Sequence, residues 1–133
     1  IRAKNKPLVF LTSNNSREMS DALKRRCLHL YIPFPDTALE RRIIQKRVPE
    51  IEEDLRNQLV SFVQQLRAQD LKKLPAVSET IDWARTLLLL HAEKLDVDLV
   101  RNTLNILLKF EDDIDNMNSD VPKFIAEALK ERV

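Results

Sequence analysis

Residues 7 to 15 read PLVFLTSNN: a proline, four apolar residues, and then four small residues with hydrogen-bonding side chains. A short apolar run of this kind is typical of a strand buried on both faces, as in parallel sheets. A second run, LHLYIPF at residues 28–34, alternates its apolar positions and is closed by prolines. The sequence therefore predicts two short strands, which need further strands beside them because two alone are not independently stable.

The segment between these runs, SREMSDALKRRC at residues 16–27, predicts a short helix with Ser16 or Ser20 as its cap. A connection of about a dozen residues allows parallel pairing, and ligands of such sheets lie beyond the carboxyl ends of the strands. Asn14 is expected at that position, where its amide can donate to an anionic oxygen and accept from a water molecule. The simpler alternative is that Asn14 and Asn15 cap the turn into the helix.

Charge is unevenly distributed along the chain. The sequence has 22 Lys and Arg against 21 Asp and Glu, a net charge of +1. Residues 1–48 hold 11 basic and 4 acidic side chains, which gives +7, and the remaining 11 basic and 17 acidic side chains give −6. The amino-terminal third is therefore the part most favourable for anions.

The composition also restricts the class of protein. Glycine is absent, which excludes a Gly-rich phosphate loop from these residues and predicts no turn that needs positive φ. Cys27 is the single cysteine, and no apolar run approaches the roughly 20 residues that cross a bilayer. We therefore expect a chain of a reducing, cytoplasmic compartment without a membrane anchor or an export signal.

From Asp36 onward the apolar positions follow a helical period. Thr37 and Glu40 predict a capping box, and the spacing predicts a helix over about 38–48. Apolar residues continue at helical spacing over 51–66, with acidic residues in the first turn, and predict a second helix.

Further helices are predicted in the remainder of the chain. One follows the turn at Pro75 and has Ser78 as its cap, and another follows Asp96 or Asp98. A last helix is predicted to contain Pro122 in its first turn, where proline is tolerated. The fold predicted from these patterns is mainly α, with a small α/β portion at the amino-terminal end.

Several conspicuous residues are better explained by structure than by chemistry. Trp83 shares a face with leucines, so we expect it in the core rather than stacked on a base. Cys27, His29 and His91 match no zinc-binding spacing. The acidic stretch EDDIDNMNSD at residues 111–120 lacks the glycine and the final glutamate of an EF-hand, so we expect a hydrated helix end and no metal site.

The order of TSN at residues 12–14, DALKRRC at 21–27, a strand and a helical region resembles an AAA+ ATPase, and the MoxR branch most closely. That family ends its first-sensor strand in T-x-N and continues with a helix of the type A-L-x-x-R-F, a strand and a helical lid. The resemblance covers essentially the whole chain. It implies that residues 1–36 are the carboxy-terminal remnant of an α/β, P-loop NTPase-type nucleotide-binding core and that residues 37–133 are an all-helical lid.

The resemblance also implies roles for individual residues. Asn14 falls on the first-sensor position, and Arg26 falls on the arginine finger that acts in trans on the neighbouring subunit. Arg25 is the alternative finger, because the two arginines are adjacent and a cysteine replaces the usual Phe. Ser78 and Glu79 occupy the second-sensor region, where the family has an arginine, so second-sensor chemistry departs from the family here.

The function implied is Mg-ATP hydrolysis in a ring, expected to be hexameric, that drives remodelling or maturation of a client protein. Some relatives mature metalloenzymes, and a von Willebrand A-domain partner is common. Residues 1–133 lack Walker A and Walker B segments, so alone they are expected to be inactive and to bind neither ATP nor Mg²⁺. The alternative is a non-enzymatic helical adaptor or a nucleic-acid-binding domain that contacts phosphates through its basic end.

Overall fold

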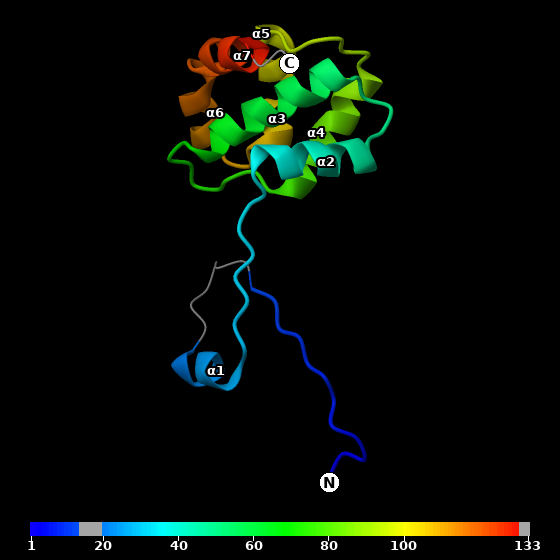
Figure 1. Cartoon of the computed structure of the whole chain (residues 1–133). Coiled ribbons are helices and arrows are strands. Elements are labelled where there is room, and N and C mark those ends of the chain that lie inside the picture. The colour runs from blue at the N-terminus through cyan, green and yellow to red at the C-terminus, as the bar shows by residue number, and fades with distance from the viewer. Residues whose placement is uncertain (14–19, 131–133) are drawn as a thin grey trace. The chain divides into compact units, whose positions relative to one another are not determined.

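The computed structural model describes residues 1–13 and 20–130 (Figure 1). The chain divides into two compact units, Ile1–Ile32 and Pro33–Val133. In the described residues the first unit contains α1 (Asp21–Arg26). The second unit contains α2 (Thr37–Arg47), α3 (Glu53–Arg67), α4 (Val77–Leu89), α5 (Val97–Leu107), α6 (Glu111–Asn118) and α7 (Val121–Lys130). Helix predominates in the described part of the chain, and the prediction of a mainly α protein is confirmed.

The two predicted strands are not present in the described residues. Residues 7–13 and 28–34 are assigned no strand, and their apolar side chains are exposed. A strand obtains its hydrogen bonds from a neighbouring strand, so isolated β-type sequences remain irregular when no neighbour lies beside them. The helix predicted between them is present as α1, with Ser20 as its cap.

The helix predicted over 38–48 is present as α2, but its start differs from the prediction. Asp36 is the cap, and its carboxylate accepts a hydrogen bond from the backbone N–H of Leu39 at 2.8 Å. Thr37 is the first helical residue, so the predicted capping box of Thr37 with Glu40 is wrong. Glu40 is instead fully buried between helices.

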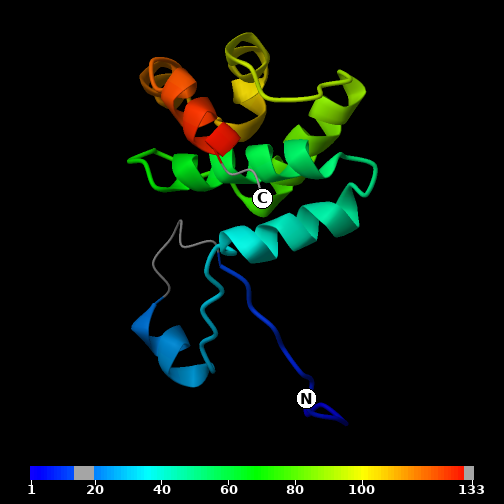
Figure 2. The same ribbon diagram turned by 45° about the horizontal axis from the view of Figure 1, so that its top comes forward.

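Helix α3 is the central element of the second unit. It packs against α2, α4 and α7, and Figure 2 shows it lying between α2 and α7. Its apolar positions recur around more than one face, which is the pattern of a helix covered on several sides. The fully buried apolar residues of α3 are Leu59, Val60, Phe62, Val63 and Leu66.

Trp83 confirms the prediction that it belongs to the core. Its side chain is 0% exposed, and its ring centroid lies 5.4 Å from that of Phe62. The indole Nε1–H donates to Thr103 Oγ1 at 2.8 Å. The indole N–H therefore has an acceptor inside the protein. Trp83 can thus pack between α3, α4 and α5 without leaving a buried donor unsatisfied.

Helix α4 ends in a turn that the absence of glycine had argued against. His91 adopts φ 55, the left-handed conformation, and donates its N–H to the Leu88 carbonyl at 3.1 Å. The N–H of Ala92 donates to the Leu87 carbonyl at 3.0 Å. These two bonds form a Schellman motif, with histidine at the position that glycine usually takes. The prediction that no residue would need positive φ is therefore wrong.

The carboxy-terminal helices agree with the sequence in part. Asp96 is the cap of α5, accepting from Leu99 N–H at 2.9 Å, and Pro122 lies in the first turn of α7 as predicted. The stretch predicted to be a hydrated helix end is a separate helix, α6, in which Asp113 is buried. In residues 1–13 and 20–130, no helix combines the length and apolar character needed to cross a bilayer.

Candidate functional site

The two candidate finger residues lie in the last turn of α1. The Ser20 hydroxyl begins this helix by accepting from Leu23 N–H at 3.3 Å, and basic residues at its end suit the helix macrodipole. Arg25 and Arg26 are both exposed. Exposure leaves their guanidinium groups accessible to another molecule, and it is also the ordinary state of a solvated helix end. Asn14, the predicted first sensor, lies outside the described residues.

Ser78 and Glu79, from the second-sensor region, lie in the first turn of α4. The predicted cap Ser78 is instead an exposed residue within the helix, and Ala76 holds the cap position. The Glu79 carboxylate accepts from Ala76 N–H at 2.9 Å and from the Ser78 hydroxyl at 3.2 Å. The Glu79 side chain therefore caps the start of α4 by accepting from the N–H of the cap residue.

The electrostatics of this turn favour an ionised carboxylate. Burial raises the pKa of Glu79, but hydrogen bonds from the N–H groups of Glu79 and Ala76 and from the Ser78 hydroxyl, together with the charge of Lys73, hold it below its usual value. An anion that is already engaged by these donors offers no positive charge to a γ-phosphate. Where the family that the sequence resembles has a positively charged arginine, this chain has a neutral serine and a negatively charged glutamate.

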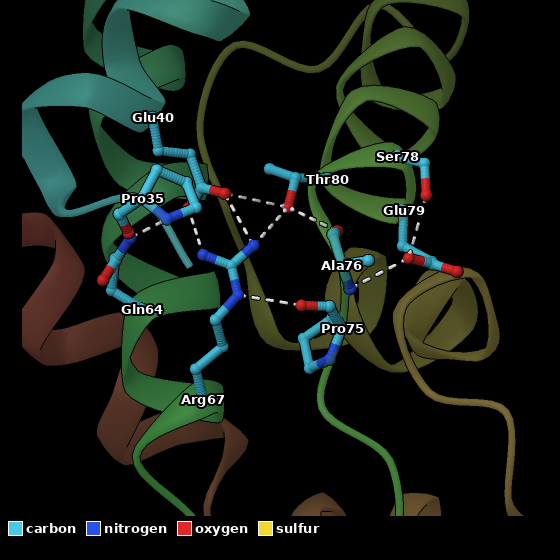
Figure 3. A network of polar contacts seen from close by, with 9 residues as sticks. All are labelled: Pro35, Glu40, Gln64, Arg67, Pro75, Ala76, Ser78, Glu79 and Thr80. Carbon is cyan, nitrogen blue, oxygen red and sulfur yellow. Dashed lines mark hydrogen bonds and ion pairs between the residues drawn. The ribbon is translucent and has the colours of Figure 1, made fainter. Parts of the chain in front are cut away.

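Close to the first turn of α4, Arg67 is the centre of a buried polar network (Figure 3). Its Nη1 and Nη2 donate to Glu40 Oε1 and Oε2 at 2.9 and 2.6 Å, which is a bidentate ion pair. Its Nε–H donates to the Pro75 carbonyl at 2.8 Å, and Nη2 also donates to Thr80 Oγ1 at 3.2 Å. The side chains of Arg67 and Glu40 are 6% and 0% exposed.

The same network holds the residues that lead into α2. Gln64 Nε2 donates to the Pro35 carbonyl and to Glu40 Oε1, both at 3.1 Å. The guanidinium carbon of Arg67 lies 4.9 Å from the centroid of the Phe34 ring, which is cation–π geometry. Figure 3 shows the side chains of Glu40, Gln64 and Arg67 converging from α2 and α3 next to the start of α4. We call the set Phe34, Pro35, Glu40, Gln64, Arg67, Pro75 and Thr80 the Arg67 junction.

The Arg67 junction is a closed structural contact. A buried ion pair is costly unless hydrogen bonds satisfy both charges, and here Glu40 accepts from Arg67 and Gln64 with the Thr80 hydroxyl 3.4 Å away. Removing one partner of such a pair leaves an uncompensated buried charge and costs about 3–5 kcal/mol, whereas replacing both by apolar residues is often neutral. Its donors and acceptors are used internally, so the junction positions helices rather than binding a ligand.

The sequence patterns predicted no role for Arg67. They predicted a capping box for Glu40, which is wrong. A usable signal was present, because Glu40 lies three and four residues before Ile43 and Ile44 and so shares the apolar face of α2. An acidic residue on a buried face needs a buried base or donor. The identity of that base depends on how α2 packs on α3, which periodicity does not specify.

The candidate residues belong to different units of the chain. Arg25 and Arg26 belong to the first unit, and Ser78 and Glu79 belong to the second. Within the second unit, the turn that carries Ser78 and Glu79 is held by the Arg67 junction through Pro75 and Thr80.

In the part of the chain that the structure describes, the usual features of a site for ATP and Mg²⁺ are not found. The sequence has no glycine for a phosphate-binding loop. Residues 1–13 and 20–130 contain no group of three or more His, Cys, Asp or Glu side chains placed to hold a metal ion. The acidic helix α6 instead uses Asp113 to accept from the backbone N–H of Lys72 and Lys73 at 3.1 and 3.4 Å.

Comparison of the chain with models of known protein families, with curated proteins and with solved structures gave no match.

Proposed function

We propose that residues 1–133 are the sensor and lid portion of a MoxR-like AAA+ ATPase that couples ATP hydrolysis to remodelling or maturation of a client protein. The order of elements supports this proposal. Helix α1 ends in two arginines, an apolar segment follows, and an all-helical unit with its own buried core begins near Thr37. This is the order of arginine-finger helix, strand and lid in the family that the sequence resembles.

The observation that carries the proposal is the apolar surface of the first unit. Large apolar side chains that precede and follow α1 in the sequence are more than half exposed: Leu8, Val9, Phe10, Leu11, Leu28, Leu30, Tyr31 and Ile32. Covering apolar surface is worth about 25 cal/mol per Å², and patches of this kind mark surfaces that another element covers. Further strands of a nucleotide-binding core would cover both segments and supply their missing hydrogen bonds.

In this proposal the site residues act on a nucleotide held by other parts of the ATPase. Asn14 orients the attacking water, and Arg26, or Arg25 in its place, offsets transition-state charge in the neighbouring subunit of a hexameric ring. The phosphate-binding loop and the Mg²⁺ ligands belong to the remainder of the core. The ring is cytoplasmic and works with a von Willebrand A-domain partner on a client, of which a metalloenzyme is one example.

The test uses the longer protein and three arginine variants. The sequence preceding Ile1 is expected to encode a Walker A motif, and the assembled ring is expected to hydrolyse ATP. Arg26→Ala should lower the rate by about 10³–10⁵ with nucleotide binding unchanged, as for other arginine fingers. Arg25→Ala tests the alternative, and Arg85→Ala, an exposed arginine of α4, is the control. A preceding sequence without a Walker A motif would refute the proposal.

A second candidate is a nucleic-acid-binding or adaptor domain, which the basic surface of α2 favours. Arg42, Lys46 and Arg47 are exposed on this helix. If they contact phosphates, affinity for duplex DNA should fall steeply with salt, and each contact should contribute to the slope. Fluorescence anisotropy of residues 1–133 with DNA at two salt concentrations measures this. The first proposal predicts no salt-dependent complex at physiological ionic strength.

A further inference from the structure

The Arg67 guanidinium is engaged in three directions at once. One edge pairs with Glu40, the Nε–H donates to the Pro75 carbonyl, and the guanidinium carbon lies 4.9 Å from the centroid of the Phe34 ring. These hydrogen bonds fix the position of the guanidinium group, and the cation–π contact places the Phe34 ring beside it. Arg67 therefore determines where Phe34 lies relative to the residues that begin α4.

Lysine would not provide the same geometry. Its ammonium group can pair with Glu40 as a point charge, but it has no Nε–H directed at Pro75 and no flat face for Phe34. If the ion pair served only to neutralise Glu40, either base would suffice. The use of four of the five N–H groups of arginine points to positioning rather than to charge balance alone.

We infer that Arg67 is a positioning residue: the Arg67 junction fixes the path of Phe34 and Pro35 against the first turn of α4. This path is the connection through which the chain from α1 enters the second unit.

The first test measures the junction in residues 1–133 and does not depend on ATPase activity. Phe34 lies between Pro33 and Pro35, which have no backbone N–H. The Phe34 amide is therefore the one backbone N–H of these three residues that can report on the connection. In ¹⁵N relaxation the Phe34 order parameter is expected to be about 0.85, and below about 0.6 in Arg67→Lys. The control is Arg101→Lys, the same substitution at an exposed arginine of α5, which should leave Phe34 unchanged.

A second variant separates positioning from stability. The double variant Glu40→Leu/Arg67→Met removes both charges, so the second unit should stay folded while the hydrogen bond to Pro75 and the contact with Phe34 are lost. Far-UV circular dichroism checks the fold, and the Phe34 order parameter should again fall. A rigid Phe34 in either folded variant overturns the inference, because the connection would then be held by something other than Arg67.

Discussion

The hydrogen bond between Trp83 and Thr103 predicts an asymmetric response to removing its two ends. Thr103→Val leaves the indole N–H buried without an acceptor, because Trp83 is 0% exposed and its Nε1 lies 2.8 Å from Thr103 Oγ1. Trp83→Phe removes the donor instead. The Thr103 hydroxyl then retains the Leu99 carbonyl, 2.8 Å away in its own helix, and is not stranded.

The magnitude follows from the cost of an unsatisfied buried donor, about 1–3 kcal/mol. Thr103→Val should therefore lower the free energy of unfolding by about 1–3 kcal/mol when Trp83 is present. In the Trp83→Phe background, Thr103→Val leaves no buried donor without an acceptor. It should therefore lower the free energy of unfolding by less than about 0.5 kcal/mol. The coupling energy between the two positions is thus expected to be about 0.5–3 kcal/mol, the range for residues in direct contact.

Urea unfolding followed by far-UV circular dichroism measures all four proteins of this cycle. Fluorescence is unsuitable because Trp83 is the only tryptophan. Thr86→Val is the matched control, since the Thr86 hydroxyl donates to the Asp82 carbonyl of its own helix. It should shift the free energy of unfolding by less than about 0.5 kcal/mol. Equal costs of Thr103→Val in the two backgrounds, at an unchanged m-value, would refute the hydrogen bond as the source of the coupling.

Three further predictions concern α4. Leu87→Ala should cost about 2–5 kcal/mol in urea unfolding because Leu87 is 0% exposed, whereas Leu89→Ala, at 78% exposure, should cost less than about 0.5 kcal/mol; similar costs would contradict the packing described. His91→Gly should raise the melting temperature, because the left-handed conformation costs a non-glycine residue about 1–2 kcal/mol, and a lowered value would contradict this. The pKa of Glu79 is depressed in the folded state, so its contribution is present above the usual pKa near 4.5 and lost as pH falls through the folded value. Glu79→Gln should therefore flatten the acid limb of a melting-temperature profile below about pH 5, and an unchanged limb would contradict it.

Much of the helical unit follows from local pattern. The helix expected over 38–48 is α2 at Thr37–Arg47, and the run of apolar residues over 51–66 is α3 at Glu53–Arg67. Asp96 as a cap and Trp83 as a core residue follow from the same kind of reasoning. These features are set within one or two helical turns, so the sequence contains the information that specifies them.

The features that were missed depend on partners distant in sequence. Asp113 in the acidic stretch is buried because its carboxylate accepts from two amides about 40 residues earlier. The two β-type runs remain without strand structure in the described residues, since a strand requires a neighbour that a local pattern does not provide. For the candidate site, the sequence placed Arg25 and Arg26 at a helix end but gave no indication of Arg67.

The sequence by itself determined a mainly α chain, the positions of most helices and the residues that fill their common core. Only the tertiary structure decided that Glu40 pairs with Arg67, 27 residues away. It also decided that Arg67 lies against Phe34 and that Gln64 donates to the Pro35 carbonyl. The physical reason is that helix periodicity states which face is buried, whereas the partner of a buried charge is chosen by how the helices pack.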